Sequence, residues 1–292
     1  MLDRYAVFGF PVAHSQSPFI HQAFAEQTGQ RLVYDRRECA PDAFADSLRA
    51  WVDQPAEAAH LGPVRGCNVT MPFKFDALRL ARQASDRAVL AGAANVLNFD
   101  TPGWSADNTD GAGLVQDLRD HEGLVLQGLH ILLIGAGGAA AGVLGPLLDE
   151  GPQRLVVSNR THAKAEALVQ RHAAVAAASH TDLQALSPEQ LPGAGTFDLV
   201  INASSTSLAG QAPPAPPQVL AEGCCAVDLV YGPSARVFLD WALHHGAARA
   251  IDGLGMLVAQ AALAFEGWRG VRPQTAPVLA ALRARLASPG AH

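Results

Sequence analysis

One stretch of this 292-residue sequence, VRGCNVTMPFK at Val64–Lys74, predicts a strand that runs directly into a helix. The apolar run ends in hydrogen-bonding side chains at Asn68 and Thr70, Pro72 stops the strand, and a helical pattern begins within two residues. Such a corner presents Asn68, Thr70 and Lys74 together at the rim of a sheet, where α/β proteins bind their ligands. A half-buried lysine there loses part of its solvation, which fits it for proton transfer. Taken alone, the corner favours the simpler interpretation of Lys74 as a solvated residue in a first helical turn.

Three further polar clusters end apolar runs in the same part of the chain. Near the N-terminus a predicted strand leads into Ser15 and Ser17, and an extended backbone would point both hydroxyls to one side, where they suit an anionic carboxylate. Ser17 also precedes Pro18, so it is alternatively the cap of a helix. The other clusters are Gly92–Asn95 and Ala106–Gly111. Single clusters of this kind are usually caps and turns, but four of them at predicted strand ends indicate a binding site.

The amino-acid composition limits the kinds of partner that the protein is expected to bind. A length of 292 residues allows two domains or one large domain, and the 49% apolar content supplies a substantial core. The formal net charge of −6 argues against nucleic acid or an anionic membrane as the main partner. Basic residues must then be placed locally wherever an anionic ligand binds.

The cysteines and the N-terminal segment indicate a cytoplasmic protein. Cys39, Cys67, Cys224 and Cys225 show neither metal-binding nor disulfide-type spacing, so no metal site is expected and a reducing compartment fits. The N-terminal segment enters a strand without the apolar core of a signal peptide. Ile131–Leu148 lacks charges, but its glycines and proline predict a buried strand, a turn and a packed helix rather than a membrane span.

Strands alternate with helical stretches along the chain, which predicts an α/β fold with parallel layers. The strands predicted for the first part are Arg4–Phe8, Leu32–Glu38, Gly66–Thr70, Ala94–Phe99 and Gly103–Ala106. The helices predicted for the same part are Pro18–Thr28, Pro41–Val52, Phe73–Gln83 and Asp86–Ala91.

A second part begins with a βαβ unit of the dinucleotide-binding type. Its strands are expected at Gly128–Gly135 and Arg154–Ser158, with a helix between them that ends near Asp149. Later strands are expected at Leu199–Asn202, Cys225–Leu229 and Arg249–Ala250, a surface loop at Ala209–Pro217, and C-terminal helices at Met256–Trp268 and Pro273–Leu286.

The glycine motif Gly135-x-Gly137-x-x-Ala140 stands between that first strand and the helix. Gly135 allows a tight turn, Gly137 allows the backbone to approach a pyrophosphate, and the helix N-terminus offers free N–H groups to phosphates. A small-residue packing turn would have the same sequence, so the motif alone leaves both interpretations open.

The end of the second strand distinguishes between the two nicotinamide cofactors. An NAD site needs a carboxylate there for the ribose 2′-hydroxyl. This strand instead ends in Asn159-Arg160-Thr161, and Lys164 follows one turn later. A guanidinium and an ammonium group suit a 2′-phosphate, which favours NADP.

The motifs occur together, and in the same order, in one known family. They are Ser15-x-Ser17-Pro18, Asn68-Val69-Thr70-x-Pro72-Phe73-Lys74, Asn95, Asp107–Gly111, Gly135–Gly138, Asn159-Arg160-Thr161 and Asp252–Gln260. With them the sequence resembles the shikimate dehydrogenases from Tyr5 to about Leu286, nearly its whole length. The resemblance implies reversible hydride transfer between NADPH and the 3-keto group of 3-dehydroshikimate, giving shikimate in the pathway of aromatic amino acid biosynthesis.

The resemblance also implies roles for individual residues. Lys74 is the expected proton donor and oxyanion stabiliser, oriented by Asp110, although a plain salt bridge between them is the alternative. The expected substrate ligands are Ser15, Ser17 and Tyr231 at the carboxylate, and Asn68, Thr70, Asn95, Asp110 and Gln260 at the ring hydroxyls. The expected NADP contacts are Gly135, Gly137, Gly138, Ala139, Asn159, Arg160, Thr161, Lys164, Asn202, Leu229, Gly253 and Met256.

A two-domain α/β architecture follows from the same resemblance. Residues 1–110 are expected to form the substrate domain, completed by C-terminal helices at 254–292 that return to it, and residues 111–253 a Rossmann-like NADP domain. The sequence departs from the usual family pattern at five places: Lys164 for arginine, Ser204 for threonine, Ser207-Leu208 for glycine-methionine, Gly232 for asparagine and Val96 for threonine.

Three alternatives remain open at the level of sequence. A quinate/shikimate dehydrogenase of broader specificity would tend to alter the serine pair or to carry an acid after the second strand. A non-catalytic dinucleotide-binding regulator would be expected to have lost Lys74 or Asp110. A tetrahydrofolate-linked dehydrogenase would not need the serine pair together with Asn68-Val69-Thr70. The oligomeric state, monomer or homodimer, is not determined by these motifs.

Overall fold

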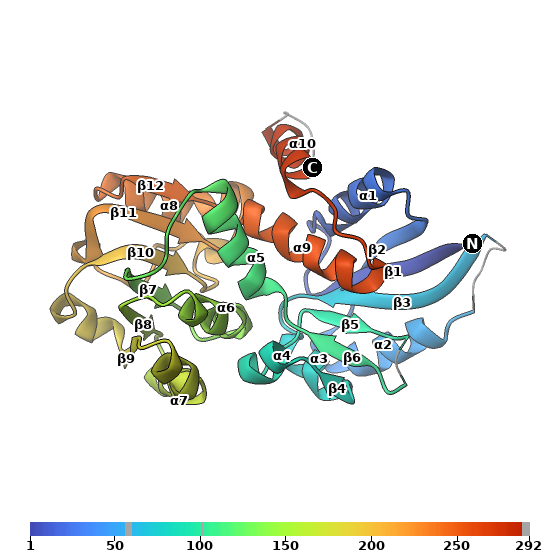
Figure 1. Cartoon of the computed structure of the whole chain (residues 1–292), viewed down its shortest axis with the longest axis horizontal. Helices are drawn as coiled ribbons and strands as arrows, with labels where there is room; N and C mark the ends of the chain where they lie inside the picture. Colours follow the sequence, from blue (N-terminus) through green and yellow to red (C-terminus); the bar gives the residue numbers. More distant parts are fainter. Residues whose placement is uncertain (56–59, 101, 288–292) are drawn as a thin grey trace. The chain divides into compact units, whose positions relative to one another are not determined.

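The computed structural model describes residues 1–55, 60–100 and 102–287. The chain divides into two compact units, a first unit of Met1–Gly113 with the chain from Val258 onward, and a second unit of Leu114–Leu257. The chain passes from the first unit to the second within helix α5 (Asp110–Gln116) and returns within helix α9 (Leu254–Arg269), as Figure 1 shows.

The first unit is built on a sheet with the strand order β2-β1-β3-β5-β6-β4. Its strands are β1 (Leu2–Gly9), β2 (Leu32–Glu38), β3 (Leu61–Val69), β4 (Gln83–Ala84), β5 (Val96–Asn98) and β6 (Ser105–Asp107). β1 pairs in parallel with β2 and β3, whereas β5 runs antiparallel to β3 and β6. The sequence predicts parallel strands throughout, and the sheet is mixed because the six residues 99–104 between β5 and β6 are too few for the crossover that a parallel pair needs.

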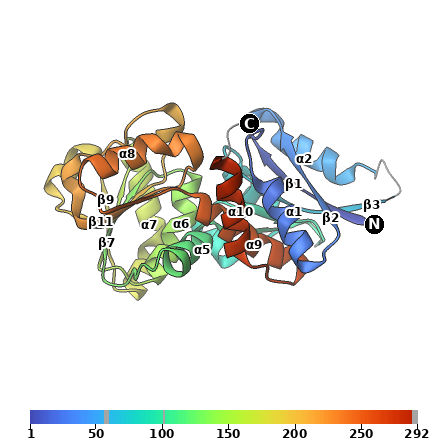
Figure 2. The same ribbon diagram turned by 90° about the horizontal axis from the view of Figure 1, so that it is seen from above.

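Both faces of this sheet are covered by helices (Figure 2). On one face, α2 (Phe44–Asp53) and α3 (Lys74–Leu80) enclose an apolar cluster that includes Phe8 and Trp51. On the other face, α1 (Ser17–Thr28) and the end of α9 pack against the sheet, where the Tyr5 and Trp268 rings lie 4.7 Å apart. A strand supplies both cores because its successive side chains point to opposite faces.

The C-terminal helices belong to the first unit, as the resemblance implies. The indole N–H of Trp268 donates to the carbonyl of Leu97 in β5 at 3.2 Å. Arg269 pairs with Asp3 in β1 at 2.5 Å, and α10 (Thr275–Ala287) packs against α1. These contacts confirm the prediction that the last part of the chain completes the N-terminal domain.

The second unit has a sheet of the order β12-β11-β10-β7-β8-β9, in which every pairing is parallel. Its strands are β7 (His130–Ile134), β8 (Arg154–Ser158), β9 (Asp182–Leu186), β10 (Phe197–Asn202), β11 (Leu220–Asp228) and β12 (Arg249–Ile251), and its helices include α6 (Gly138–Asp149), α7 (His162–Ala178) and α8 (Arg236–His244). Ile131 and Leu133 enter one core, and Leu132 and Ile134 the other. This sheet, apolar on both faces, confirms the predicted Rossmann-like unit.

Several element bounds agree with the sequence and others differ. β2, β8 and the helix α4 (Asp86–Ala91) have the predicted bounds. The predicted helix Phe73–Gln83 is too long, because the backbone becomes extended at Ala81 and Gln83 already pairs with Ser105 of β6. β3 begins at Leu61, well before the predicted Gly66, although Pro63 lies within it. β9, α7 and α8 were not predicted individually.

Candidate active site

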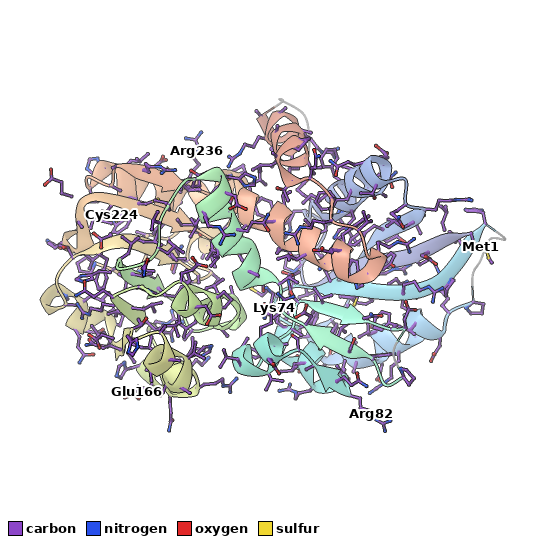
Figure 3. The ribbon with its side chains drawn as sticks, viewed as in Figure 1. Met1, Lys74, Arg82, Glu166, Cys224 and Arg236 are labelled. Carbon is purple, nitrogen blue, oxygen red and sulfur yellow. The ribbon has the colours of Figure 1, made fainter. Side chains whose placement is uncertain are left out.

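The strand-to-helix corner has the form that the sequence predicts. β3 ends at Val69, the N–H of Phe73 donates to the carbonyl of Thr70 at 3.0 Å, and α3 begins at Lys74 (Figure 3). The Lys74 carbonyl accepts a 2.8 Å hydrogen bond from the N–H of Ala94, which ties the corner to the segment that leads into β5. The simpler interpretation of Lys74 as a solvated residue does not hold, since its side chain is only 14% exposed, although it does lie in the first turn of α3.

A largely buried ion pair forms the centre of the candidate site. The Lys74 Nζ lies 2.5 Å from Oδ2 of Asp110, whose side chain is 6% exposed. Asp110 begins α5, and its N–H donates to Oδ1 of Asn108, whose own amide donates to the carbonyl of Ala93. Asn108 was not predicted as a site residue, although its place in the Asn-Thr-Asp motif is a signal that could have identified it.

Asn95 connects this pair to the C-terminal helix. Its Nδ2 donates to Asp110 Oδ1 and to Gln260 Oε1, both at 3.0 Å, and its Oδ1 accepts from the N–H of Thr109 at 2.8 Å. All these side chains are buried. The backbone N–H of Thr109 can only donate, so the orientation of the Asn95 amide is fixed with its oxygen towards Thr109 and its nitrogen towards the acid.

Asn68 lies near the end of β3, and its side-chain amide is hydrogen-bonded by buried residues of other elements. Its Oδ1 accepts from the hydroxyl of Tyr34 at 2.6 Å and lies 3.1 Å from Nε2 of His21. Its Nδ2 donates to the carbonyl of Asn95 at 3.3 Å. Tyr34 comes from β2 and His21 from α1, and both are buried. Neither was predicted, because an aromatic residue and a histidine among apolar neighbours have the pattern of an ordinary core.

The two serines are brought together, but by a turn rather than by an extended backbone. Their hydroxyl oxygens lie 3.2 Å apart, and the N–H of Ser15 donates to the carbonyl of Val12 at 3.0 Å. The helix α1 begins at Ser17, and Gln16 before it provides no side-chain cap. The Nε of Arg36 donates to the carbonyl of Ser15 at 2.8 Å and holds the turn. Thr70, also predicted here, is half-buried, and its N–H donates to Phe8 of β1.

The glycine turn of the second unit fits a pyrophosphate. Gly135 has φ +119°, and a Cβ there would lie 2.9 Å from the carbonyl oxygen of Ala203, so only glycine suits this turn. A Cβ on Gly137 would meet nothing within 4 Å, which leaves the backbone open to a ligand. Gly138 and Ala139 begin α6, so the free N–H groups of this helix N-terminus face the turn.

The residues after β8 fit a 2′-phosphate. Arg160, Thr161 and Lys164 are exposed, and neither cation forms an ion pair with a carboxylate in the described part of the chain. Asn159 shapes the turn, since its Nδ2 donates to the carbonyl of Thr161 at 2.9 Å. The cofactor implied by the sequence, NADP, is therefore compatible with the backbone of the glycine turn and with the side chains that follow β8.

A cluster of buried polar side chains lies at the ends of β10 and β11. The amide of Asn202 donates to Ser207 Oγ at 3.0 Å and to Asp228 Oδ2 at 3.3 Å, and the Ser207 hydroxyl donates to the same carboxylate. Burial raises the pKa of Asp228 above its ordinary value. Ser207 and Asp228 were not predicted, although a carboxylate that ends the apolar strand β11 is a visible signal.

The remaining predicted residues all lie in the second unit. The N–H of Leu229 donates to the Asn202 carbonyl at 3.0 Å, and the N–H of Gly253 to the carbonyl of Val230 at 3.0 Å. Met256 is buried, and Tyr231 is half-buried just before a short turn of helix. The predicted set is thus divided, with Lys74, Asp110 and most substrate ligands in the first unit, and Tyr231 and the cofactor residues in the second.

Residues 1–55, 60–100 and 102–287 contain neither a metal-binding cluster nor a membrane-spanning helix. Within these ranges no group of three or more His, Cys, Asp or Glu side chains could hold a metal ion. No helix of the same ranges is both long enough and apolar enough to cross a membrane.

Comparison with known families places recognised domains along most of the chain. Residues 7–97 match the substrate binding domain of shikimate dehydrogenase, residues 118–208 match shikimate/quinate 5-dehydrogenase, and residues 253–283 match the C-terminal domain of shikimate 5′-dehydrogenase.

Individual relatives match over nearly the full length. The shikimate dehydrogenase (NADP(+)) of Methylibium petroleiphilum is 56% identical, covering 97% of this chain and 94% of its own. That of an Acidovorax species is 55% identical and covers 98% of both chains. Among solved structures, shikimate 5-dehydrogenase of Thermus thermophilus in complex with NADP(H) and shikimate superposes with a TM-score of 0.80 at 31% identity, covering 97% of this chain and 99% of that one.

Proposed function

The chain belongs to the shikimate dehydrogenase family, and on that premise we propose that it catalyses the reversible NADPH-dependent reduction of 3-dehydroshikimate to shikimate. The reaction belongs to the pathway of aromatic amino acid biosynthesis. The observation that carries the proposal is the largely buried Lys74–Asp110 pair, held at 2.5 Å inside a network of amide side chains. A plain surface salt bridge would need neither the burial nor the network.

Lys74 is the proposed proton donor. An ammonium group has three N–H donors, and the 2.5 Å contact with Asp110 engages one of them. The remaining donors can reach the substrate oxygen on which negative charge develops during reduction, and one can transfer its proton there. The hydride comes from NADPH when this cofactor is bound.

Asp110 is proposed to orient the lysine and to contact a substrate hydroxyl. Its Oδ2 accepts a hydrogen bond from the Lys74 ammonium, and its Oδ1 accepts one from the Asn95 amide at 3.0 Å. With both oxygens held, the carboxylate cannot rotate, so the ammonium has one preferred direction. Preorganised charges of this kind stabilise a transition state without having to reorganise during the reaction.

The substrate itself is a ring with a carboxylate and several hydroxyls, and the first unit offers matching groups. We propose that Ser15 and Ser17, together with Tyr231, bind the carboxylate. Asn68, Thr70, Asn95 and Gln260 are proposed to bind ring hydroxyls. Neutral amides suit hydroxyls, because a buried polar group left without a partner costs about 1–3 kcal/mol.

The second unit is the proposed NADP site. Gly135, Gly137, Gly138 and Ala139 would hold the pyrophosphate, and Arg160 would bind the 2′-phosphate with help from Lys164 and Thr161. Asn159 shapes that turn. Asn202, Leu229, Gly253 and Met256 are proposed to line the nicotinamide end. Residues 1–110 with 254–292 form the proposed catalytic domain and residues 111–253 the NADP domain, and we expect a cytoplasmic monomer or homodimer.

A direct assay tests the proposed function. The purified protein is given shikimate or quinate, each with NADP⁺ or NAD⁺, and formation of the reduced cofactor is followed by absorbance. We expect strong turnover with shikimate and NADP⁺ only. Comparable rates with quinate or NAD⁺ would instead indicate a dehydrogenase of broader specificity, in line with the shikimate/quinate family that residues 118–208 match. No turnover in any combination, with NADPH still bound, would indicate a regulator.

A further inference from the structure

Beneath Asn68 lie two buried side chains that the proposed chemistry does not use, Tyr34 of β2 and His21 of α1. Their rings stack at 4.2 Å with an angle of 5° between the planes. We propose that Tyr34 and His21 are positioning residues, which fix the amide of Asn68 so that it offers the substrate an N–H donor and never its oxygen. The inference rests on the proposed function, in which Asn68 binds a substrate hydroxyl.

Both contacts of the Asn68 oxygen come from groups that act as donors. Burial raises the pKa of Tyr34 well above its ordinary value, so its hydroxyl keeps its proton. Burial also lowers the pKa of His21 to about 3, so its imidazole is neutral and carries one N–H. Because Oδ1 of Asn68 can only accept, the N–H must be on Nε2, and Nδ1 of His21 correspondingly has no hydrogen-bond partner among the described residues.

The nitrogen of the Asn68 amide is left facing the site. One of its two N–H groups donates to the carbonyl of Asn95 at 3.3 Å. A flipped amide would set its oxygen against the Asn95 carbonyl, an acceptor against an acceptor, so this carbonyl fixes which end of the amide faces it. The Tyr34 hydroxyl and the Nε2–H of His21 then donate to the oxygen and hold the amide in this orientation. The second N–H is therefore available to an oxygen lone pair of the ligand, either a hydroxyl or a keto group.

Tyr34 also links two parts of the substrate site. Its hydroxyl donates to Asn68, and the Ser17 side chain lies near enough to oppose the rise that burial causes in the pKa of Tyr34. Ser17 in turn lies 3.2 Å from Ser15 through their hydroxyl oxygens. A single phenol thus fixes the spacing between the proposed carboxylate site and a proposed hydroxyl site, which makes it a determinant of which ring substitution pattern fits.

A double-mutant cycle tests the inference through Tyr34→Phe, Asn68→Ala and the combined variant. If Tyr34 acts through Asn68, Y34F alone should raise KM for shikimate about five- to tenfold with a smaller change in kcat. The combined variant should then be no worse than N68A alone, within about twofold. Binding of shikimate measured by calorimetry should follow the same pattern, and the Kd of NADPH should not change.

Two controls separate positioning from stability. Tyr5→Phe removes another buried phenol of the same sheet, whose hydroxyl contacts Arg269 instead of Asn68, and should leave KM for shikimate unchanged. His21→Gln keeps a donor near the position of Nε2 and should resemble the parent protein, whereas His21→Leu should resemble Y34F. If H21L does not fold, Y34F and N68A still decide the question.

The outcomes distinguish this inference from the proposed function. An unchanged KM in Y34F, or effects of Y34F and N68A that multiply in the combined variant, would show that Tyr34 does not act through Asn68, while the proposed reaction would stand. An N68A variant that binds and turns over shikimate normally would remove Asn68 from the substrate site, and the inference with it.

Discussion

The two candidate sites of this protein differ in how deeply their polar side chains are buried and in how those side chains are held. In the first unit, Lys74, Asp110, Asn95 and Asn68 are largely buried, and each is held by another polar group. In the second unit, Arg160 stands exposed at a strand end, without an ion-pair partner among the described residues. The first site is organised before a ligand arrives, whereas the second presents charge and open backbone.

The difference follows from what each site is proposed to recognise. A neutral hydroxyl is recognised only through the direction of its hydrogen bonds, and a buried unpaired partner costs about 1–3 kcal/mol, so the polarity of each amide must be fixed. A phosphate is recognised by charge and accepts donors from several directions, so mobile side chains in high dielectric suffice. Substitutions in the first unit should therefore affect turnover and discrimination, and those in the second mainly cofactor affinity.

The largest expected effect comes from Lys74, at the centre of the candidate site in the first unit. Lys74→Met should lower kcat by about 10²–10⁴-fold, because the proton donor and the charge facing the developing alkoxide are lost together. The Kd of NADPH, measured by fluorescence titration, should stay the same. Arg79→Met, which removes an exposed cation at the other end of α3, is the matched control and should leave kcat unchanged. Turnover of K74M close to that of the parent would contradict the assigned role.

A smaller effect is expected in the exposed site. Arg160→Gln should raise KM for NADPH by about ten- to a hundredfold, the range of one or two lost charge-assisted hydrogen bonds, and leave the activity with NADH unchanged. The measurement is initial-rate kinetics with both cofactors. Lys164→Gln should have a weaker effect of the same kind, because an ammonium group on a flexible stem is more hydrated and less directional. Equal losses with NADPH and NADH would rule out the 2′-phosphate contact.

The difference between the two sites also explains which site residues could be predicted from the sequence. Lys74, Asp110 and Arg160 are polar residues directly after apolar runs, a pattern that is visible along one strand or helix. The contacts that orient them depend on pairing across strands far apart in the sequence. Tyr34 meets Asn68 only because β1 lies between their strands in the sheet, and Gln260 meets Asn95 only because α9 returns to the first unit. The end of α3 at Leu80 was missed because β4 pairs with a strand that follows it in sequence.

The smallest expected effect concerns the pH dependence of stability, and it compares one buried histidine from each unit. His21 supports the site of the first unit and His172 lies in α7 of the second, where its Nδ1 bonds the Leu168 carbonyl; burial lowers the pKa of both. A histidine whose folded pKa is depressed binds a proton only when the chain unfolds, so its contribution is full above pH 6.5 and declines as the pH falls. For His21, with a folded pKa of about 3, the decline is about 1.4 kcal/mol per pH unit between pH 6 and pH 4.

Urea unfolding of the parent protein and of His21→Gln and His172→Gln at pH 7, 6 and 5 measures this contribution. Each variant should lose less stability on acidification than the parent. The difference should be larger for H21Q, because the pKa of His21 is lowered as far as about 3, a larger shift than that of His172. At pH 7, only a substitution at position 21 that removes the donor, such as H21L, should also raise KM for shikimate. Equal effects of H21L and His172→Leu on KM would mean that both histidines merely stabilise the fold, and the contrast between an organised and an open site would lose its support from His21.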